Sequence, residues 1–261
     1  MIELIDIIII ATGFINGSFL YTMATRLQNN DSIWRRSSCD HCSRVINVIA
    51  LIPVFGFIVY RGKSACCKNR VSIKYPLFEI FNAAFAYIIF LKLGWSLAFI
   101  HFFLIFELLL LISIIDFNSY LIFPQPIIIG LIIQSIWLVF FGSVEIINSL
   151  IGLFAGAGIF HWIAYLYQVI RKKEGLGEGD ATLLGLIGYC LGWHILFSTI
   201  FWGASFGIIG GGSLLVLKKH SLKKEIAFGP WLVLAAFLSW YYPSFFQNFP
   251  MGAMSKLFVV F

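Results

Sequence analysis

Long apolar runs separated by short polar segments make up most of this chain. The runs cover residues 2–24, 76–91, 95–115, 123–141, 146–170, 181–197, 198–217 and 228–246. Apolar runs of roughly 20 residues with few charges are typical of helices that cross a membrane. The pattern therefore predicts an all-α integral membrane protein with about eight transmembrane helices.

The first run resembles a secretion signal in its position. However, it begins with Glu3 and Asp6 instead of basic residues, and its apolar stretch is long. A signal peptide has a basic start and a shorter apolar centre. We therefore expect residues 2–24 to be a retained first transmembrane helix.

Two apolar stretches depart from the regular pattern. Val45–Tyr60 is short and contains Pro53 and Gly56, so an interfacial or buried hairpin fits it better than a transmembrane helix. The run 198–217 is interrupted by glycines, which we expect to let helices pack closely. These glycines are Gly203, Gly207, Gly210, Gly211 and Gly212.

Composition excludes a soluble protein. The chain is 60% hydrophobic and 11% charged, whereas a soluble domain has about 25% charged residues. The net charge of +6 reports membrane topology and contact with anionic lipid, and it gives no reason to expect nucleic-acid binding.

The basic residues test the topology. Of 18 Lys and Arg residues, nine lie between Arg26 and Lys74, three lie at 171–173 and four lie at 218–224. With eight spans and the N-terminus outside, all three clusters fall on the cytoplasmic side, as the positive-inside rule requires. We therefore expect a first helix at 1–24, a cytoplasmic basic domain at 25–75 and a membrane domain at 76–250.

Two acids fall at the inner membrane surface in this topology. Asp116 follows the third run and Asp180 precedes the sixth. Each has an ordinary structural interpretation: Asp180 can cap the helix that follows it, and Asp116 can reach headgroup water.

Together, the two acids suggest a different chemistry. Facing carboxyls share a proton, so one can activate water while the other polarises a peptide carbonyl and protonates the leaving amine. Helix ends favour an anion at Asp180 and disfavour one at Asp116, so we expect Asp116 to hold the proton more often. We expect Gly177 and Gly179 to permit positive φ and to leave room for an extended substrate.

Two other classes of protein use paired acids in a membrane. A proton- or ion-coupled transporter would place them near the bilayer midplane and show an internal repeat. Here both acids lie at one face and no convincing repeat is found. A membrane scaffold with structural acids is the other alternative.

Four cysteines lie in the predicted cytoplasmic domain, and these are Cys39, Cys42, Cys66 and Cys67. Disulfides do not persist in the cytoplasm, so four thiols suggest a tetrahedral zinc site. Free structural thiols are the alternative, and His41 is a possible substitute ligand. We expect Cys190, in the sixth run, to be a small apolar packing residue.

Several motifs together resemble those of the type IV prepilin peptidases, which are GxGD-type membrane aspartic proteases that often also act as N-methyltransferases. The resemblance covers nearly the whole chain. The motifs that carry it are 17-GSFLYTMATRL-27, 35-RRSSCDHC-42, 74-KYPLFEIFNA-83, 176-LGEGDATLLGLIG-188 and 226-IAFGPWLVLAAFLS-239.

The resemblance implies that Asp180 is the GxGD aspartate and that Asp116 is its catalytic partner. The substrates would be type IV prepilins or type II secretion pseudopilins, cut at the cytoplasmic face of the bacterial inner membrane by a multi-pass protein. The peptidase would need no cofactor, whereas methylation would use S-adenosylmethionine and the 25–75 domain. The residues expected to attract and seat the leader are Gly177, Gly179, Glu174 and Glu178.

Three positions depart from the family pattern. Phe123-Pro124-Gln125 stands where the family has an Ile-Pro-Asp type sequence, and Thr182 stands where it often has lysine. Aligned on Lys74, the third family cysteine falls on Ser64, with Cys66 displaced beside Cys67. None of these changes removes a carboxylate assigned to catalysis.

Overall fold

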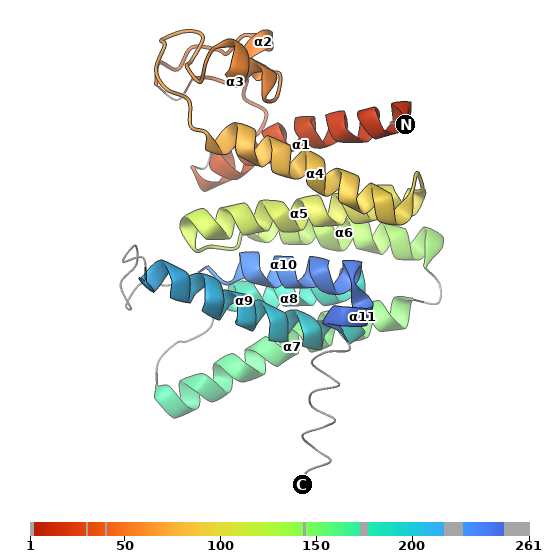
Figure 1. Cartoon of the computed structure of the whole chain (residues 1–261). Helices are drawn as coiled ribbons and strands as arrows, with labels where there is room; N and C mark the ends of the chain where they lie inside the picture. The colour runs from red at the N-terminus through yellow and green to blue at the C-terminus, as the bar shows by residue number, and fades with distance from the viewer. Residues whose placement is uncertain are drawn as a thin grey trace. The chain divides into compact units, whose positions relative to one another are not determined.

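The computed structural model describes residues 3–29, 31–39, 41–142, 145–172, 177–216 and 227–247 (Figure 1). These ranges contain helices and no strand, which confirms the all-α prediction. The helices are α1 (Leu4–Gln28), α2 (Val48–Leu51), α3 (Phe55–Val59), α4 (Lys74–Leu93), α5 (Leu97–Ser119), α6 (Pro124–Phe141), α7 (Ile146–Arg171), α8 (Glu178–Leu191), η1 (Trp193–Ile195), α9 (Leu196–Val216), α10 (Gly229–Tyr241) and α11 (Pro243–Phe246).

Helix length and hydropathy support a multi-pass membrane protein. Within the described ranges, six helical segments are long and apolar enough to cross a membrane, namely α1, α4, α5, α6, α7 and Trp193–Gly211. A helix lies near each of the other two predicted spans, but α8 has 14 residues and α10 has 13. At about 1.5 Å per residue α8 is roughly 21 Å long, shorter than a hydrocarbon core of about 30 Å. The count of eight spans and their orientation therefore stay predictions.

The sixth and seventh runs divide earlier than expected. Helix α8 ends at Leu191, and α9 begins at Leu196 after the short helix η1. Gly192, between them, has φ 90° and ψ 159°, a conformation that is essentially restricted to glycine. The expected boundary at 197/198 is wrong because hydropathy does not register this backbone turn.

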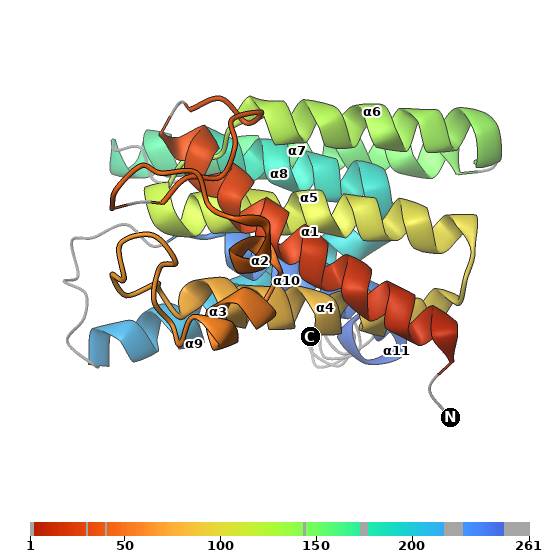
Figure 2. The same cartoon turned by 90° about the horizontal axis from the view of Figure 1, so that it is seen from above.

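The chain forms two compact units, Met1–Phe103 and Leu104–Phe261, whose boundary falls within α5. In the first unit α1 and α4 run antiparallel in direct contact (Figure 2). A Cβ on Gly13 would lie 2.6 Å from the Ala83 Cα. Four residues along α1, a Cβ on Gly17 would lie 3.0 Å from the Glu79 Cα. Glycine at these positions lets the two backbones approach closely.

The predicted hairpin at Val45–Tyr60 is confirmed as the two short helices α2 and α3. A Cβ on Gly56 would lie 2.5 Å from the Ala50 carbonyl oxygen, so glycine is needed for the helices to meet. The hairpin exposes apolar side chains, with Val48 77% exposed and Ile58 65% exposed. Its position at a membrane interface stays a prediction.

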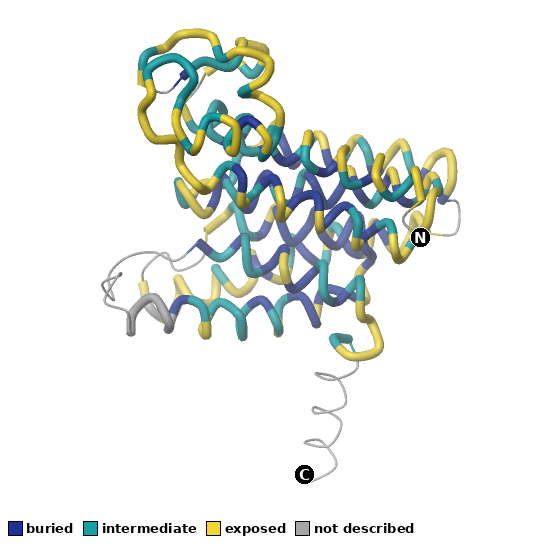
Figure 3. Tube along the Cα trace, turned by 45° about the horizontal axis from the view of Figure 1, so that its top comes forward, coloured by how far each residue is buried: buried dark blue, intermediate teal, exposed yellow. Residues whose placement is uncertain are grey.

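Helix α8 is enclosed in the second unit. Every residue from 183 to 191 is buried, whereas the first three residues of α8, at 178–180, are exposed or half-buried. Figure 3 shows the degree of burial along the trace. Gly188 of α8 lies against Gly152 of α7, backbone to backbone, and the Leu186 methyl groups would contact a Cβ on Gly130 of α6. The α7–α8 contact is antiparallel, because Gly156 meets Leu184 one turn farther along.

Aromatic packing joins α5 to α10. The ring of Phe106, which is fully buried, lies 5.1 Å from the rings of both Phe237 and Trp240. Helix α10 also packs closely against Gly203 and Gly210 of α9, which confirms the expected role of these two glycines, whereas a Cβ on Gly207 would make only ordinary contacts. Helix α10 therefore contacts both α5 and α9, and its first residue, Gly229, lies at the end of α5.

Candidate active site and cysteine cluster

Asp116 lies in the last turn of α5 and is 5% exposed. Its Oδ2 accepts a hydrogen bond of 2.8 Å from the backbone N–H of Gly229. Gly229 is the first residue of α10, where backbone N–H groups lack partners within the helix and the helix dipole is positive. The start of α10 therefore orients the Asp116 carboxyl and stabilises negative charge on it.

Gly229 has no room for a side chain. A Cβ there would lie 2.7 Å from Oδ2 of Asp116 and 3.3 Å from a methyl group of Leu183 in α8. Three elements therefore converge at this residue. The sequence shows a Gly-Pro pair that begins a helix, which is a recognised start signal, but it does not indicate that the glycine contacts Asp116.

Asp180 is the third residue of α8 and is half-buried. The N-cap of α8 is Gly177 and no side chain caps the helix. The interpretation of Asp180 as a helix cap is therefore wrong, because the helix begins two residues earlier. Its carboxyl lies within electrostatic range of that of Asp116, so the two acids belong to the same region of the fold.

The expectation that Asp116 holds the shared proton more often than Asp180 rests on the helix dipoles, and the structure adds a contact with the opposite effect. Asp180 lies in the first turn of α8, where the dipole favours an anion. The Gly229 N–H favours an anion at Asp116 as well, although Asp116 lies near the C-terminus of α5. Both carboxyls therefore have a helix N-terminus beside them, and the assignment of the proton to Asp116 stays a prediction.

The glycine-rich turn before Asp180 has a more ordinary conformation than expected. Gly177 has φ −68°, and Gly179 lies within α8. The expected positive φ is therefore wrong. A Cβ on Gly179 would lie 2.8 Å from the Cβ of Ile122, so the close approach is made by this chain's own α5–α6 connection. Glu178 is exposed at the start of α8, and Glu174 lies outside the described residues.

For the peptidase activity that the sequence resemblance implies, substituting Gly229 by alanine is expected to lower the rate of cleavage by about 10- to 100-fold, because the added methyl group displaces the Asp116 carboxyl from its N–H donor. The measurement is kcat/KM on a prepilin in membranes, with protein accumulation determined in parallel. Pro230→Ala, at the next position, is the matched control. Wild-type kcat/KM for Gly229→Ala would contradict a positioning role.

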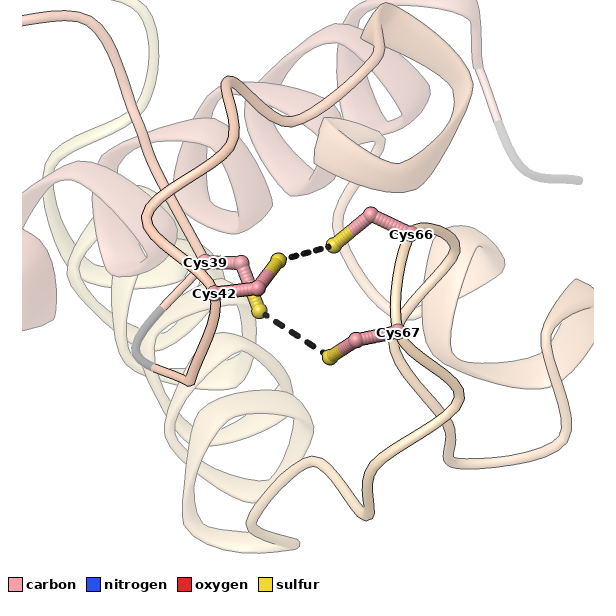
Figure 4. Close-up of side chains that lie close together, drawn as sticks. All are labelled: Cys39, Cys42, Cys66 and Cys67. Carbon is pink, nitrogen blue, oxygen red and sulfur yellow. Dashed lines mark hydrogen bonds between the residues drawn. The ribbon is translucent and has the colours of Figure 1, made fainter.

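The four cysteines of the first unit form a cluster. Their sulfur atoms all lie within 4.8 Å of one another, with the Cys39–Cys67 pair at 3.7 Å and the Cys42–Cys66 pair at 3.1 Å (Figure 4). Tetrahedral zinc with Zn–S bonds of about 2.3 Å requires S···S separations of about 3.8 Å. The Cys39–Cys67 separation already fits this value, whereas the Cys42 and Cys66 sulfur atoms would have to move apart by roughly 0.7 Å. The cluster can therefore hold a metal ion.

Two similar turns carry these cysteines. In the first, Cys39 N–H donates to the Arg44 carbonyl across the Ser38–Val45 bridge. In the second, Ser64 N–H donates to the Asn69 carbonyl across the Lys63–Arg70 bridge. By these matching hydrogen bonds, Ser64 in the second turn corresponds to Cys39 in the first, and Cys67 corresponds to Cys42. The alignment on Lys74 also placed a family cysteine at Ser64. The fourth thiol comes from Cys66, at the position of His41 in the first turn.

Hydrogen bonding adjusts the acidity of the thiols. The Ser64 hydroxyl, followed by the backbone at His41 and Cys42, lowers the pKa of the Cys39 thiol to about 6. The Ser64 hydroxyl also lowers the pKa of Cys66, whereas the hydrogen bond with Cys66 raises the pKa of Cys42 to about 12. These hydrogen bonds favour the thiolate form of Cys39, which is the form that binds metal.

Comparison with known proteins gives two family matches. A family model described as "Bacterial Peptidase A24 N-terminal domain" matches residues 11–93, and one described as "Type IV leader peptidase family" matches residues 102–212. The second match contains Asp116 and Asp180. No solved structure shows a significant match to this chain.

Curated relatives share most of their length with the chain, and each is named prepilin leader peptidase/N-methyltransferase. The Pectobacterium carotovorum subsp. carotovorum protein is 31% identical over 207 residues, which are 77% of this chain and 72% of the relative. The Bacillus subtilis (strain 168) protein is 28% identical over 235 residues, 88% of this chain and 91% of the relative. The Pseudomonas putida protein is 28% identical over 204 residues, 78% of this chain and 70% of the relative.

Proposed function

Because the chain belongs to the type IV leader peptidase family, we propose that it is a membrane aspartic endopeptidase that removes the leader of type IV prepilins or type II secretion pseudopilins. The observation that carries the proposal is that the carboxyls of Asp116 and Asp180 lie close enough to interact electrostatically, with that of Asp116 held by the Gly229 N–H. The site would face the cytoplasm in the bacterial inner membrane. The comparisons give no support to the transporter alternative.

Cleavage follows from the chemistry of a carboxyl pair that shares one proton. The ionised carboxyl takes a proton from a water molecule, and the resulting nucleophile attacks the scissile carbonyl carbon. The protonated carboxyl donates to the carbonyl oxygen and then supplies a proton to the leaving amine. The Gly229 N–H holds Oδ2 of Asp116, and we propose that the other oxygen of this carboxyl contacts the substrate.

The exposed start of α8 fits a basic leader. Glu178 is exposed at the first position of α8, two residues before Asp180, and its negative charge attracts a cationic segment. We propose that Gly177 and Glu178, with Glu174, form the approach to the two aspartates, whereas Gly179 is already covered by Ile122.

A purified substrate tests the proposed cleavage. Membranes that contain the protein are incubated with a prepilin, and mass spectrometry of the product determines the cleavage position. We expect loss of a short basic leader immediately before the apolar helix of the substrate. Uncleaved substrate in the presence of correctly inserted protein would contradict the proposal.

We propose that the protein also methylates the new N-terminal amine, because its relatives are named N-methyltransferases. S-adenosylmethionine would be the methyl donor. With the donor added to the same incubation, we expect the cleaved product to gain the mass of one methyl group. Cleavage without any gain in mass would restrict the protein to the peptidase reaction.

The cysteine cluster supports a zinc site that holds the two turns of the first unit together. Four sulfur atoms within 4.8 Å of one another come from segments more than 20 residues apart in the sequence. A structural zinc ion contributes its binding free energy directly to folding. The site would stabilise the loop without taking part in peptide cleavage.

Metal analysis tests the zinc site. Purified wild-type protein is expected to carry about one equivalent of zinc, and Cys39→Ser is expected to reduce this to less than about a tenth. Cys190→Ser is the matched control, because Cys190 is buried in α8, outside the cluster. A wild-type zinc content that stays below half an equivalent would contradict the site.

A further inference from the structure

Two sequence signatures have no part in the aspartate pair, and the structure brings them together. The segment 17-GSFLYTMATRL-27 lies in α1 and 74-KYPLFEIFNA-83 lies in α4. Gly17 lies directly against Glu79, and the Ser18 hydroxyl hydrogen-bonds to the Glu79 carboxyl. A contact of this kind requires an explanation, because Glu79 is only 7% exposed and buried carboxylates are rare.

The Glu79 carboxyl also holds a strained turn. Val54 N–H donates to Oε2 of Glu79 at 2.7 Å. Val54 has φ 58° and ψ −46°, and Phe55 N–H bonds to the Pro53 carbonyl across it, which makes a γ-turn of the rare form with positive φ. A β-branched residue in this conformation is a genuine outlier, and such strain persists where the surrounding structure fixes it, often at binding sites.

The turn and the carboxyl line a cavity of about 780 Å³ in the first unit. Volumes of about 300–1,000 Å³ are typical of small-molecule sites. Besides Glu79 and Val54, the wall carries the cation Arg26 and the rings of Tyr60 and Tyr75. Arg26 is oriented by a 2.7 Å hydrogen bond to the Ile33 carbonyl, and the Tyr60 hydroxyl accepts one from Asn47 at 2.9 Å.

We propose that this cavity is the methyl-donor site and that Glu79 is the carboxylate that recognises the cationic sulfonium centre of S-adenosylmethionine. The inference rests on the proposed methyltransferase function and specifies its site. It needs the side chains of α1 and α4 as well as the loop between them, so the 25–75 segment does not contain the whole site.

The chemistry of the donor matches the wall of the cavity. The sulfonium is attracted to a carboxylate and to aromatic faces, the α-carboxylate of the donor pairs with a guanidinium, and the adenine ring can stack on tyrosine. When bound, the donor supplies a methyl group: a neutral amine forms the new N–C bond, the C–S bond breaks with its electron pair left on sulfur, and the amine proton goes to solvent. Glu79 and Arg26 supply the two opposite charges that this ligand requires.

The cysteine cluster forms part of the same wall, because Cys39 and Cys66 both line the cavity. The two cysteine-bearing turns therefore position loop residues around the ligand. Disruption of the cluster should accordingly affect donor binding more than peptide cleavage.

Equilibrium binding to purified full-length protein tests the inference. S-adenosylmethionine and its neutral product S-adenosylhomocysteine are compared by calorimetry for wild type, Glu79→Gln and Ser18→Ala. We expect Glu79→Gln to weaken binding of the cationic donor by about tenfold or more and to change binding of the neutral thioether by less than about threefold. Ser18→Ala, which keeps the charge, should weaken donor binding by only a few-fold. Glu3→Gln, an exposed acid at the start of α1, is the matched control.

Each outcome decides a separate point. An unchanged donor Kd in Glu79→Gln, or equal weakening of both ligands, would overturn the role of Glu79. A wild-type protein that neither binds the donor nor methylates cleaved product would refute the methyltransferase function itself, and the inference with it. Prepilin cleavage by each variant shows that it is folded, and if Glu79→Gln does not accumulate, the Ser18→Ala comparison carries the test.

Discussion

Replacing either Asp116 or Asp180 by asparagine is expected to lower kcat/KM for prepilin cleavage by about 10³-fold or more. Asparagine keeps the size of the side chain but neither accepts nor donates the proton that the reaction needs. Because the two carboxyls act as one unit, the double variant should be no worse than about threefold below either single variant. The measurement is the initial rate of product formation in membranes with equal amounts of each protein.

Glu145→Gln is the matched control for this experiment. Glu145 is an exposed acid of the same unit, at the start of α7, and its side chain makes no capping hydrogen bond. It should leave kcat/KM unchanged. Wild-type cleavage by either aspartate variant would remove the peptidase assignment, and additive losses in the double variant would contradict a shared proton.

Gly152→Ala is expected to destabilise the second unit by about 3 kcal/mol or more. The added Cβ would overlap the Gly188 carbonyl oxygen of α8, which is backbone and cannot rotate away. Since α7 and α8 meet backbone to backbone here, the helices must separate, and α8 carries Asp180. We expect a lower thermal unfolding midpoint and little cleavage activity.

Gly158→Ala is a matched control on the same helix, because a Cβ at that position would contact nothing within 4 Å. It should leave the unfolding midpoint unchanged or raise it, since alanine favours helix over glycine by about 1 kcal/mol. If the two alanine variants unfold at the same temperature, the close α7–α8 contact does not stabilise the fold as described.

Hydropathy was sufficient to predict most of the helices. The runs 123–141 and 146–170 agree closely with α6 and α7. A glycine, Gly142, follows α6, and the charged residues Arg171 and Lys172 stand at the end of α7, so the change in residue type coincides with the end of each helix. Hydropathy did not predict where the helix that contains Asp116 ends. Hydropathy ends the third run at 115, whereas α5 continues to Ser119, because backbone hydrogen bonding does not require apolar side chains.

The sequence was sufficient to propose which residues form the aspartate pair and the cysteine cluster, but not how they contact the rest of the chain. The sequence indicated Asp116, Asp180 and the four cysteines by residue type and spacing. It did not indicate that Gly229 donates to Asp116, or that the Ser64 hydroxyl contacts the thiols of Cys39 and Cys66. The contacts of Asp116 and of Cys39 join segments far apart in the chain, and local patterns carry no information about them. The cap assigned to Asp180 was wrong for a local reason, since Gly177 can begin a helix as well.

The central claim is that Asp116 and Asp180 belong to one site, and cross-linking tests it most directly. A protein with Asp116→Cys and Asp180→Cys is treated with a bifunctional methanethiosulfonate that has a two-carbon spacer, and the linked peptides are identified by mass spectrometry. The matched control pairs Asp116→Cys with Glu145→Cys, which lies beyond the far end of α6, about 27 Å along that helix. The account predicts efficient linkage of positions 116 and 180 and none of 116 and 145. Failure to link 116 with 180, although each single cysteine reacts with the reagent, would contradict it.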